Sequence, residues 1–269
     1  MPLHVDSYFA MGKTHTVCQD YAATLNSCDT VVLAVSDGCS SSPDTDFGSR
    51  FLVRTGIRDC TFAGPSNAGS WNGILQSAKR AQEVMGLPYH SLDATLLLAH
   101  VHEGKIYVRM WGDGVVSVKF KDGTYQIIEV EFEDNTPAYL SYLGSESALS
   151  RYTARHGLRN VKVYDADGLT TTKKPVTMEE YNLSWTFDLA EVEALFLLSD
   201  GASSFRQRHS STSWQPISLL ETLAMMTDIK NPNGEFMVRR MRKFLYEFCP
   251  KNNWIHEDDI AIAALVNVE

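Results

Sequence analysis

The sequence predicts an α+β fold in which blocks of strands and blocks of helices stack as layers. Short apolar runs bounded by turn residues predict strands, and longer segments with apolar residues at helical spacing predict helices. Consecutive strand segments fill residues 94–132, whereas helical segments occur in pairs before and after them. The chain has 269 residues, 44% of them hydrophobic, and no Pro/Gly/Ser-rich linker divides it, so we expect one domain over residues 1–269.

The elements are expected in the following order. A buried strand ends at Ser36, and helices follow over 47–62 and 70–86. Four strands then form an antiparallel meander through Phe132, with tight turns at Glu103-Gly104, Asp113-Gly114 and Asp122-Gly123. A strand around Leu195, helices over 216–228 and 235–248 and a last strand over 259–268 complete the chain. The stretch of about 135–177 is predicted to be irregular, which makes it a candidate flap or insertion.

Composition excludes several classes of partner. The formal net charge of -9 argues against a general binder of nucleic acid, because such proteins need cations for the phosphate backbone. No apolar run approaches the length of a membrane span, and the first residues lack the pattern of a signal peptide. The 5 cysteines are odd in number and show no C-x-x-C pairing, which fits a reducing compartment. We therefore expect a cytoplasmic protein that binds neither nucleic acid nor membranes; its oligomeric state is left open.

Two Asp-Gly pairs follow apolar runs at the ends of predicted core strands. Asp37-Gly38 follows TVVLAVS, and Asp200-Gly201 follows ALFLLS. A hairpin turn is the alternative interpretation of Asp-Gly, and it fits Asp122-Gly123, which lies between two alternating runs. After Asp37 and Asp200 the chain continues into a small polar loop, and no returning strand begins two residues later. These carboxylates therefore suggest a site for a hard cation.

Asp20 and Asp258 also lie at the ends of predicted strands. Sheet order could bring all four carboxylates together, although spacing alone does not establish it. Four carboxylates in one pocket repel one another unless cations neutralise them, and oxygen ligands favour Mg²⁺ or Mn²⁺ over zinc.

A series of motifs runs along nearly the whole chain. Their order is Cys18-Gln19-Asp20, VVLAVSDG, DATLLLAHV, YVRMWGDG, LFLLSDG and EDDIAIAAL. This order and its spacing resemble the successive motifs of the metal-dependent protein phosphatase (protein phosphatase 2C) family, and G-x-x-H with C-Q-D resembles a bacterial branch of that family.

The resemblance implies two antiparallel β-sheets packed as a sandwich, with helices on both outer faces and a two-metal centre at one end. By position, Asp37 would bridge two Mg²⁺ or Mn²⁺ ions, and the carbonyl of Gly38 would bind one of them. Asp200 and Asp258 would complete the other ion's shell, and Asp20 would act from the shell around both. Asp113, in WGDG, matches an aspartate associated with a third, weaker ion, although a hairpin turn is an equal alternative for it.

The sequence departs from the family pattern at three positions. Gln19 replaces the usual Glu before the first Asp. His15 stands where the family commonly carries the Arg that contacts the substrate phosphate, and it joins Asp37 and Asp200 as a candidate catalytic residue. Cys39 stands where some members carry a His proposed as general acid.

The function that the resemblance implies is hydrolysis of phosphoserine and phosphothreonine in a phosphorylated protein substrate, by a water that the metal ions activate. Two alternatives stay open. The first is a catalytically silent binding or regulatory module that keeps the phosphatase fold. The second is a small-molecule phosphohydrolase with the same centre.

Overall fold

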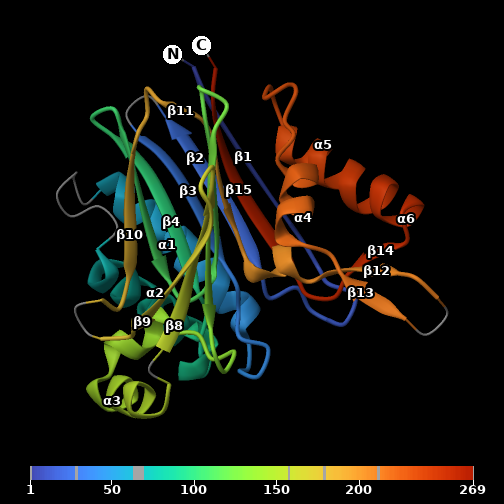
Figure 1. Ribbon diagram of the computed structural model, residues 1–269. Coiled ribbons are helices and arrows are strands. Elements are labelled where there is room, and N and C mark those ends of the chain that lie inside the picture. The colour runs from blue at the N-terminus through green and yellow to red at the C-terminus, as the bar shows by residue number, and fades with distance from the viewer. Residues whose placement is uncertain are drawn as a thin grey trace.

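The computed structural model describes residues 2–27, 30–62, 70–156, 158–177, 180–210 and 213–268. Two main antiparallel sheets pack face to face with helices outside them, so the predicted α+β sandwich is confirmed (Figure 1). The seven-stranded sheet has the order β1 (Leu3–Ala10), β15 (Ile260–Asn267), β11 (Val192–Leu198), β6 (Gly114–Phe120), β7 (Tyr125–Phe132), β8 (Leu158–Asp165) and β9 (Gly168–Pro175). The five-stranded sheet has the order β10 (Leu183–Asp188), β5 (Lys105–Trp111), β4 (Leu96–His102), β3 (Thr30–Ser36) and β2 (Tyr21–Ser27).

Helices cover the outer face of each sheet. On the five-stranded sheet lie α1 (Thr45–Phe62) and α2 (Trp71–Met85), with the short helix η1 (Tyr89–Leu92) beside them. On the seven-stranded sheet lie α4 (Leu219–Met226) and a continuous helical run made of α5 (Phe236–Lys243), η4 (Phe244–Phe248) and α6 (Cys249–Lys251). Beside this run, β13 (Trp214–Pro216), β12 (Phe205–Arg208) and β14 (Trp254–His256) form a small third sheet. None of the described helices is long and apolar enough to span a membrane.

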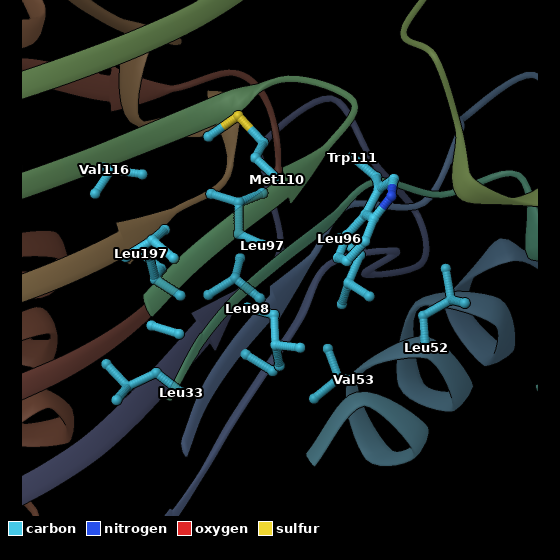
Figure 2. Close-up of a cluster of buried hydrophobic side chains, with 14 of the residues drawn as sticks. Leu33, Leu52, Val53, Leu96, Leu97, Leu98, Met110, Trp111, Val116 and Leu197 are labelled. Atoms are coloured by element: carbon cyan, nitrogen blue, oxygen red, sulfur yellow. The ribbon is translucent and has the colours of Figure 1, made fainter. Parts of the chain in front are cut away.

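The hydrophobic core has two layers, because the central strands β15 and β11 of the seven-stranded sheet are buried on both faces. Along β11, Leu195 and Leu197 face the layer between the sheets, and Phe196 and Leu198 face the layer under α4 and α5. Figure 2 shows Leu197 near Leu33 of β3 and Leu97 of β4, with Leu52 and Val53 of α1 farther away. The apolar run before Asp200 therefore forms a core strand, as its composition predicts.

The predicted meander is correct in its strands but wrong in one connection. β4 pairs with β5, and β6 pairs with β7, yet β5 belongs to the five-stranded sheet and β6 to the seven-stranded sheet. The link at Asp113-Gly114 is therefore a crossing between sheets, and the hairpin interpretation of Asp113 is wrong. Gly112 and Gly114 have φ of 89° and 134°, which L side chains rarely adopt, so both glycines are required for this crossing.

Residues 135–177 contain more regular structure than the sequence predicts. The short helix η2 (Leu140–Gly144) and helix α3 (Glu146–Arg155) are followed by the β8–β9 hairpin, which extends the edge of the seven-stranded sheet. Gly157, one of the residues that suggested irregularity, lies outside the described residues. The expectation of an irregular stretch is wrong, and a role as flap or insertion stays a prediction.

Candidate metal centre

Five aspartates lie at the same end of the sandwich, where core strands begin or end. Asp20 precedes β2 and Asp37 follows β3, and these strands pair with Tyr21 opposite Ser36. Asp200 follows β11 and Asp258 precedes β15, which pair with Leu198 opposite Ile262. Asp113 lies in the crossing between β5 and β6. Where two antiparallel strands pair, one strand ends beside the start of the other. The pairing thus brings together residues that are far apart in the sequence.

The five carboxyl groups interact closely enough to disturb one another's ionisation. Burial is the largest cause in each case, and it raises the pKa of Asp20, Asp37, Asp113 and Asp258 above the ordinary value. Burial, with repulsion from Asp258, raises the pKa of Asp200 to about 6. Asp37 is in hydrogen-bond contact with both Asp20 and Asp200, and their charges raise its pKa further.

Two buried oxygens of this group have no hydrogen-bond partner among the residues that the structure describes. These are Oδ2 of Asp20 and Oδ1 of Asp113, in side chains of residues that are 1% and 5% exposed. A buried acceptor without a partner is costly unless a ligand satisfies it. A cavity of about 260 Å³ adjoins Asp113, and its lining also includes Asp200 and Asp258. In the described part of the chain, no three His, Cys, Asp or Glu side chains are arranged to hold an ion as they stand.

Gly38 is placed by close backbone packing. A Cβ atom at this position would lie 2.7 Å from the carbonyl oxygen of Thr45, so a larger residue does not fit. The neighbouring Asp37 N–H donates to Thr95 Oγ1 over 3.0 Å, and the Thr95 N–H donates to the Asp37 carbonyl over 2.8 Å. Thr95 therefore has a structural role in fixing the backbone of the Asp37-Gly38 pair.

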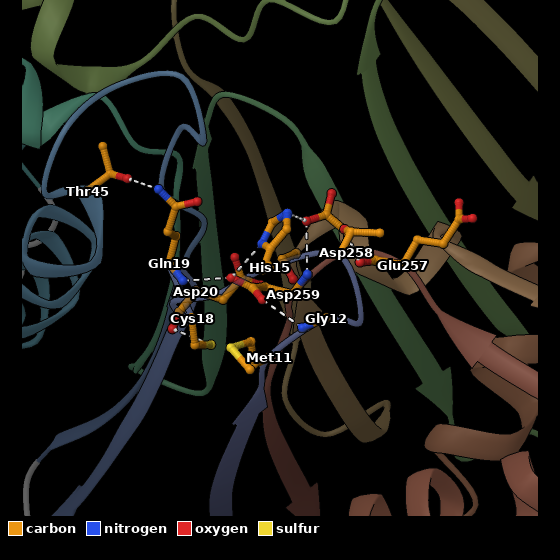
Figure 3. Close-up of polar contacts among 12 residues, drawn as sticks. Met11, Gly12, His15, Cys18, Gln19, Asp20, Thr45, Glu257, Asp258 and Asp259 are labelled. Atoms are coloured by element: carbon orange, nitrogen blue, oxygen red, sulfur yellow. Dashed lines mark hydrogen bonds and ion pairs between the residues drawn. The ribbon is translucent and has the colours of Figure 1, made fainter.

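His15 lies between two acidic side chains of the loop before β15 (Figure 3). Its Nε2 is 3.2 Å from Asp258 Oδ1, and its Nδ1 is 3.0 Å from Asp259 Oδ2. The His15 side chain is 21% exposed. Both ring nitrogens thus face carboxylates, and the imidazole joins the Asp258 edge of the site to the loop that carries Asp20.

Sequence reasoning missed the role of Asp259. This residue is 2% exposed and accepts the backbone N–H of Gly12 over 2.7 Å and that of Gln19 over 2.6 Å (Figure 3). The Gln19 side chain, which replaces the expected Glu, donates from Nε2 to Thr45 Oγ1 over 2.6 Å. Asp259 therefore fixes the loop between β1 and β2, while Gln19 joins that loop to the start of α1. The sequence does show two adjacent aspartates, Asp258 and Asp259, before the last strand. It does not tell which of the two side chains points into the protein.

The sequence profile of one family covers most of the chain. The family model for protein phosphatase 2C matches residues 12–246. The chain belongs to the protein phosphatase 2C family. No curated protein matches the sequence.

Several solved structures share the protein phosphatase 2C fold with this chain. The serine/threonine phosphatase Stp1 from Staphylococcus aureus has a TM-score of 0.59 at 13% identity, covering 100% of this chain and 96% of that one. The S. agalactiae serine/threonine phosphatase has a TM-score of 0.56 at 13% identity, covering 99% and 100%. A bacterial serine phosphatase has a TM-score of 0.54 at 11% identity, covering 98% of each chain. At these identities the similarity shows the fold alone.

Cys39 is one of the three positions at which this member of the protein phosphatase 2C family departs from the family pattern. Burial acts to raise the pKa of the Cys39 thiol, but hydrogen bonds from the hydroxyls of Ser41, Tyr139 and Ser42 outweigh it, and the pKa is lowered. The Sγ atom lies 3.1 Å from Ser41 Oγ. The thiol thus lies in a polar setting beside Asp37, made by the hydroxyls of Ser41, Ser42 and Tyr139.

Proposed function

We propose that this protein is a Mg²⁺- or Mn²⁺-dependent phosphatase that hydrolyses phosphoserine and phosphothreonine in protein substrates through a metal-activated water. The observation that carries the proposal is the group of five aspartates, all with raised carboxyl pKa values, at one end of the fold. So much mutually repelling charge favours a cation-binding role over a purely structural one.

The residues present fit the ions. Every side-chain donor in the group is a carboxylate oxygen, which suits Mg²⁺ and Mn²⁺. The oxygens of Asp20 and Asp113 that lack a hydrogen-bond partner among the described residues supply acceptors for an ion. Asp37 would hold both of two ions, the Gly38 carbonyl would bind one of them, and Asp200 and Asp258 would complete the shell of the other. Asp20 would act from the surrounding shell, and Asp113 would hold a third ion.

When bound, such ions supply Lewis-acid activation of a water and offset charge on the phosphoryl oxygens. The chain's own residues provide the setting for this chemistry. The cavity beside Asp113 and Asp200 gives a phosphoryl group access to the carboxylates. His15, in contact with Asp258 and Asp259, would hold the Asp258 carboxylate in place, and it stays a proposed catalytic residue.

The test is release of phosphate from a phosphothreonine peptide and from p-nitrophenyl phosphate with and without Mn²⁺. We expect Asp37→Asn and Asp200→Asn each to lower the rate by at least about 100-fold, because each removes a charge from the ion shell. Asp122→Asn is the matched control, since Asp122 lies in an exposed hairpin. Equal rates for the three variants would refute the assignment. Activity on the small ester alone would favour a small-molecule phosphohydrolase.

A catalytically silent phosphatase-fold module is the second candidate. It is favoured by Gln19, whose amide is engaged with Thr45, and by Cys39 in place of an imidazole. Calorimetric titration with Mn²⁺ distinguishes the two candidates. The enzyme requires binding at millimolar concentration or tighter, whereas a folded protein that binds no Mn²⁺ and hydrolyses neither substrate is the silent module.

A further inference from the structure

Asp93 is a buried carboxylate outside the proposed metal centre. It is 4% exposed and lies between η1 and β4. Its Oδ1 accepts a hydrogen bond from Ser141 Oγ over 2.7 Å. Its Oδ2 accepts one from Ser42 Oγ over 3.3 Å and lies 2.8 Å from His90 Nδ1. Three separate segments of the chain therefore meet at one side chain.

One of these segments is the loop that begins with the Asp37-Gly38 pair. The Asp93 carbonyl accepts the Cys39 N–H over 2.9 Å, and Gly38 forms a β-bridge with Ala94. The Asp93 carboxylate then holds Ser42, three residues further along the same loop. Asp93 thus fixes this loop at two points immediately after the pair that we assign to the ions.

A second segment is the turn at residues 139–142, at the start of η2. Ser141 is fully buried, and its carbonyl accepts the Tyr89 hydroxyl over 3.0 Å. In the same turn, the Tyr139 side chain is hydrogen-bonded to Cys39 and packs edge-on against Tyr142 at 5.6 Å between ring centroids. The turn and the loop are therefore joined twice, through Asp93 and through Tyr139.

We propose that Asp93 is a positioning residue that couples the 139–142 turn to the loop carrying Asp37 and Gly38, so that the two become ordered together. The assignment of Asp37 and Gly38 to a metal centre rests on the proposed function; the coupling itself rests on the hydrogen bonds of Asp93. Because a carboxylate accepts hydrogen bonds from several donors at once, one buried Asp can hold both segments in register.

Ser141→Ala tests the coupling at its far end, because Ser141 is far from the loop in the sequence and its hydrogen bonds go to Asp93 and Tyr89. We expect Ser141→Ala to weaken Mn²⁺ binding about 10-fold in calorimetry, as for loss of groups that support metal ligands. The Mn²⁺ concentration for half-maximal activity should rise equally, with kcat at saturating Mn²⁺ within about twofold of the original protein. Ser145→Ala is the matched control, since Ser145 caps α3 from the other end of η2. It should leave Mn²⁺ affinity unchanged.

Hydrogen exchange of the metal-free protein gives a readout that is independent of activity and of ions. The coupling predicts faster exchange in both 139–144 and 39–42 for Ser141→Ala, and the same pattern for Asp93→Asn, which keeps the side-chain shape. Faster exchange confined to 139–144, or unchanged Mn²⁺ affinity in a protein that binds Mn²⁺, would overturn the proposal. If the original protein hydrolyses nothing, the proposed function fails, while the exchange data still decide the coupling.

Discussion

Some side chains at the candidate centre hold backbone segments in place in addition to carrying charge. Asp259 receives two N–H groups from the loop between β1 and β2, and His15 contacts both Asp259 and Asp258. The entry to β15 and the entry to β2 are thereby held together. This fixed loop supports the position of Asp20, which the pairing of β2 with β3 places beside Asp37.

The raised pKa of Asp200 predicts a pH dependence of stability in the metal-free protein. Burial and the Asp258 charge raise the pKa from 3.8 to about 6, so the folded chain keeps the proton to higher pH than the unfolded chain. The stability due to this group is present below about pH 4 and is lost as the pH rises through about 6. The loss should be on the order of 1 to 3 kcal/mol.

Urea denaturation of EDTA-treated protein at pH 4.5 and pH 7 measures this loss. Asp200→Asn, which cannot ionise, should show a smaller fall in unfolding free energy between the two pH values than the original chain. The attribution to Asp200 would be wrong if both proteins showed the same fall.

The sequence indicates some site residues more clearly than others. Asp37 and Asp200 stand out because each follows an unbroken apolar run that forms a buried strand. For the pair Asp258-Asp259, spacing cannot decide which side chain turns inward. That choice depends on Gly12, where a Cβ atom would lie 2.2 Å from the Asp258 carbonyl carbon. Such a close approach between distant segments is a property of the folded chain.

At the scale of elements, α1 depends on one close contact with η1. A Cβ atom added at Gly48 would lie 1.6 Å from the Ser91 carbonyl oxygen, which is backbone and cannot move away. We expect Gly48→Ala to lower the unfolding free energy by about 3 kcal/mol or more, because α1 must shift off η1.

Gly56→Ala is the control within the same helix. Its Cβ would meet the Leu98 side chain at 3.3 Å, and the helix gains from replacement of glycine, so a change within about 1 kcal/mol is expected. Urea unfolding of both variants checks the contrast. Similar effects of the two substitutions would contradict the role given to the Gly48 contact.

The connection between β5 and β6 shows where local patterns fail. Alternating residues around Asp113-Gly114 are typical of a hairpin, and the strands themselves are predicted correctly. Membership of a sheet, however, depends on which neighbours each strand packs against. At Gly114, a Cβ atom would lie 2.8 Å from the Leu198 carbonyl, which shows how closely the crossing approaches β11. A hairpin pattern carries no information about that partner.

For the whole molecule, the proposed ions should be a large source of stability. Because the five aspartates come from strands of both sheets, ions bound there would join the sheets at one end. At a Mn²⁺ concentration of about 100 times Kd, binding should add about 2.7 kcal/mol to the unfolding free energy and raise Tm by about 5 °C or more. Differential scanning calorimetry checks this increase. EDTA and Asp37→Asn should each abolish it, and an increase that survives in Asp37→Asn would place the ions elsewhere.

The sandwich as a whole was predictable mainly because buried strands have a clear composition. β1 was not predicted, since every residue of Leu3–Ala10 is half-buried and the polar run from Asp6 to Ser7 interrupts its alternation. Its place at the sheet edge comes from pairing with β15, the last strand of the chain. Pairing between sequence-distant strands is the information that local patterns lack.

The pairing of β1 with β15 also places the two ends of the fold together. Leu3 lies opposite Asn267 and Ala10 lies opposite Ile260, so both ends leave the sheet on the side away from the aspartates (Figure 1). The eight residues of β1 span about 25 Å, which separates Leu3 from the end of the sheet where the aspartates lie. A short linker could therefore join Leu3 to Asn267 into a circular permutant, with new ends opened at the exposed Asp122-Gly123 turn. Tethering to a surface through a segment attached at Leu3 or Asn267 would leave the cavity facing solution.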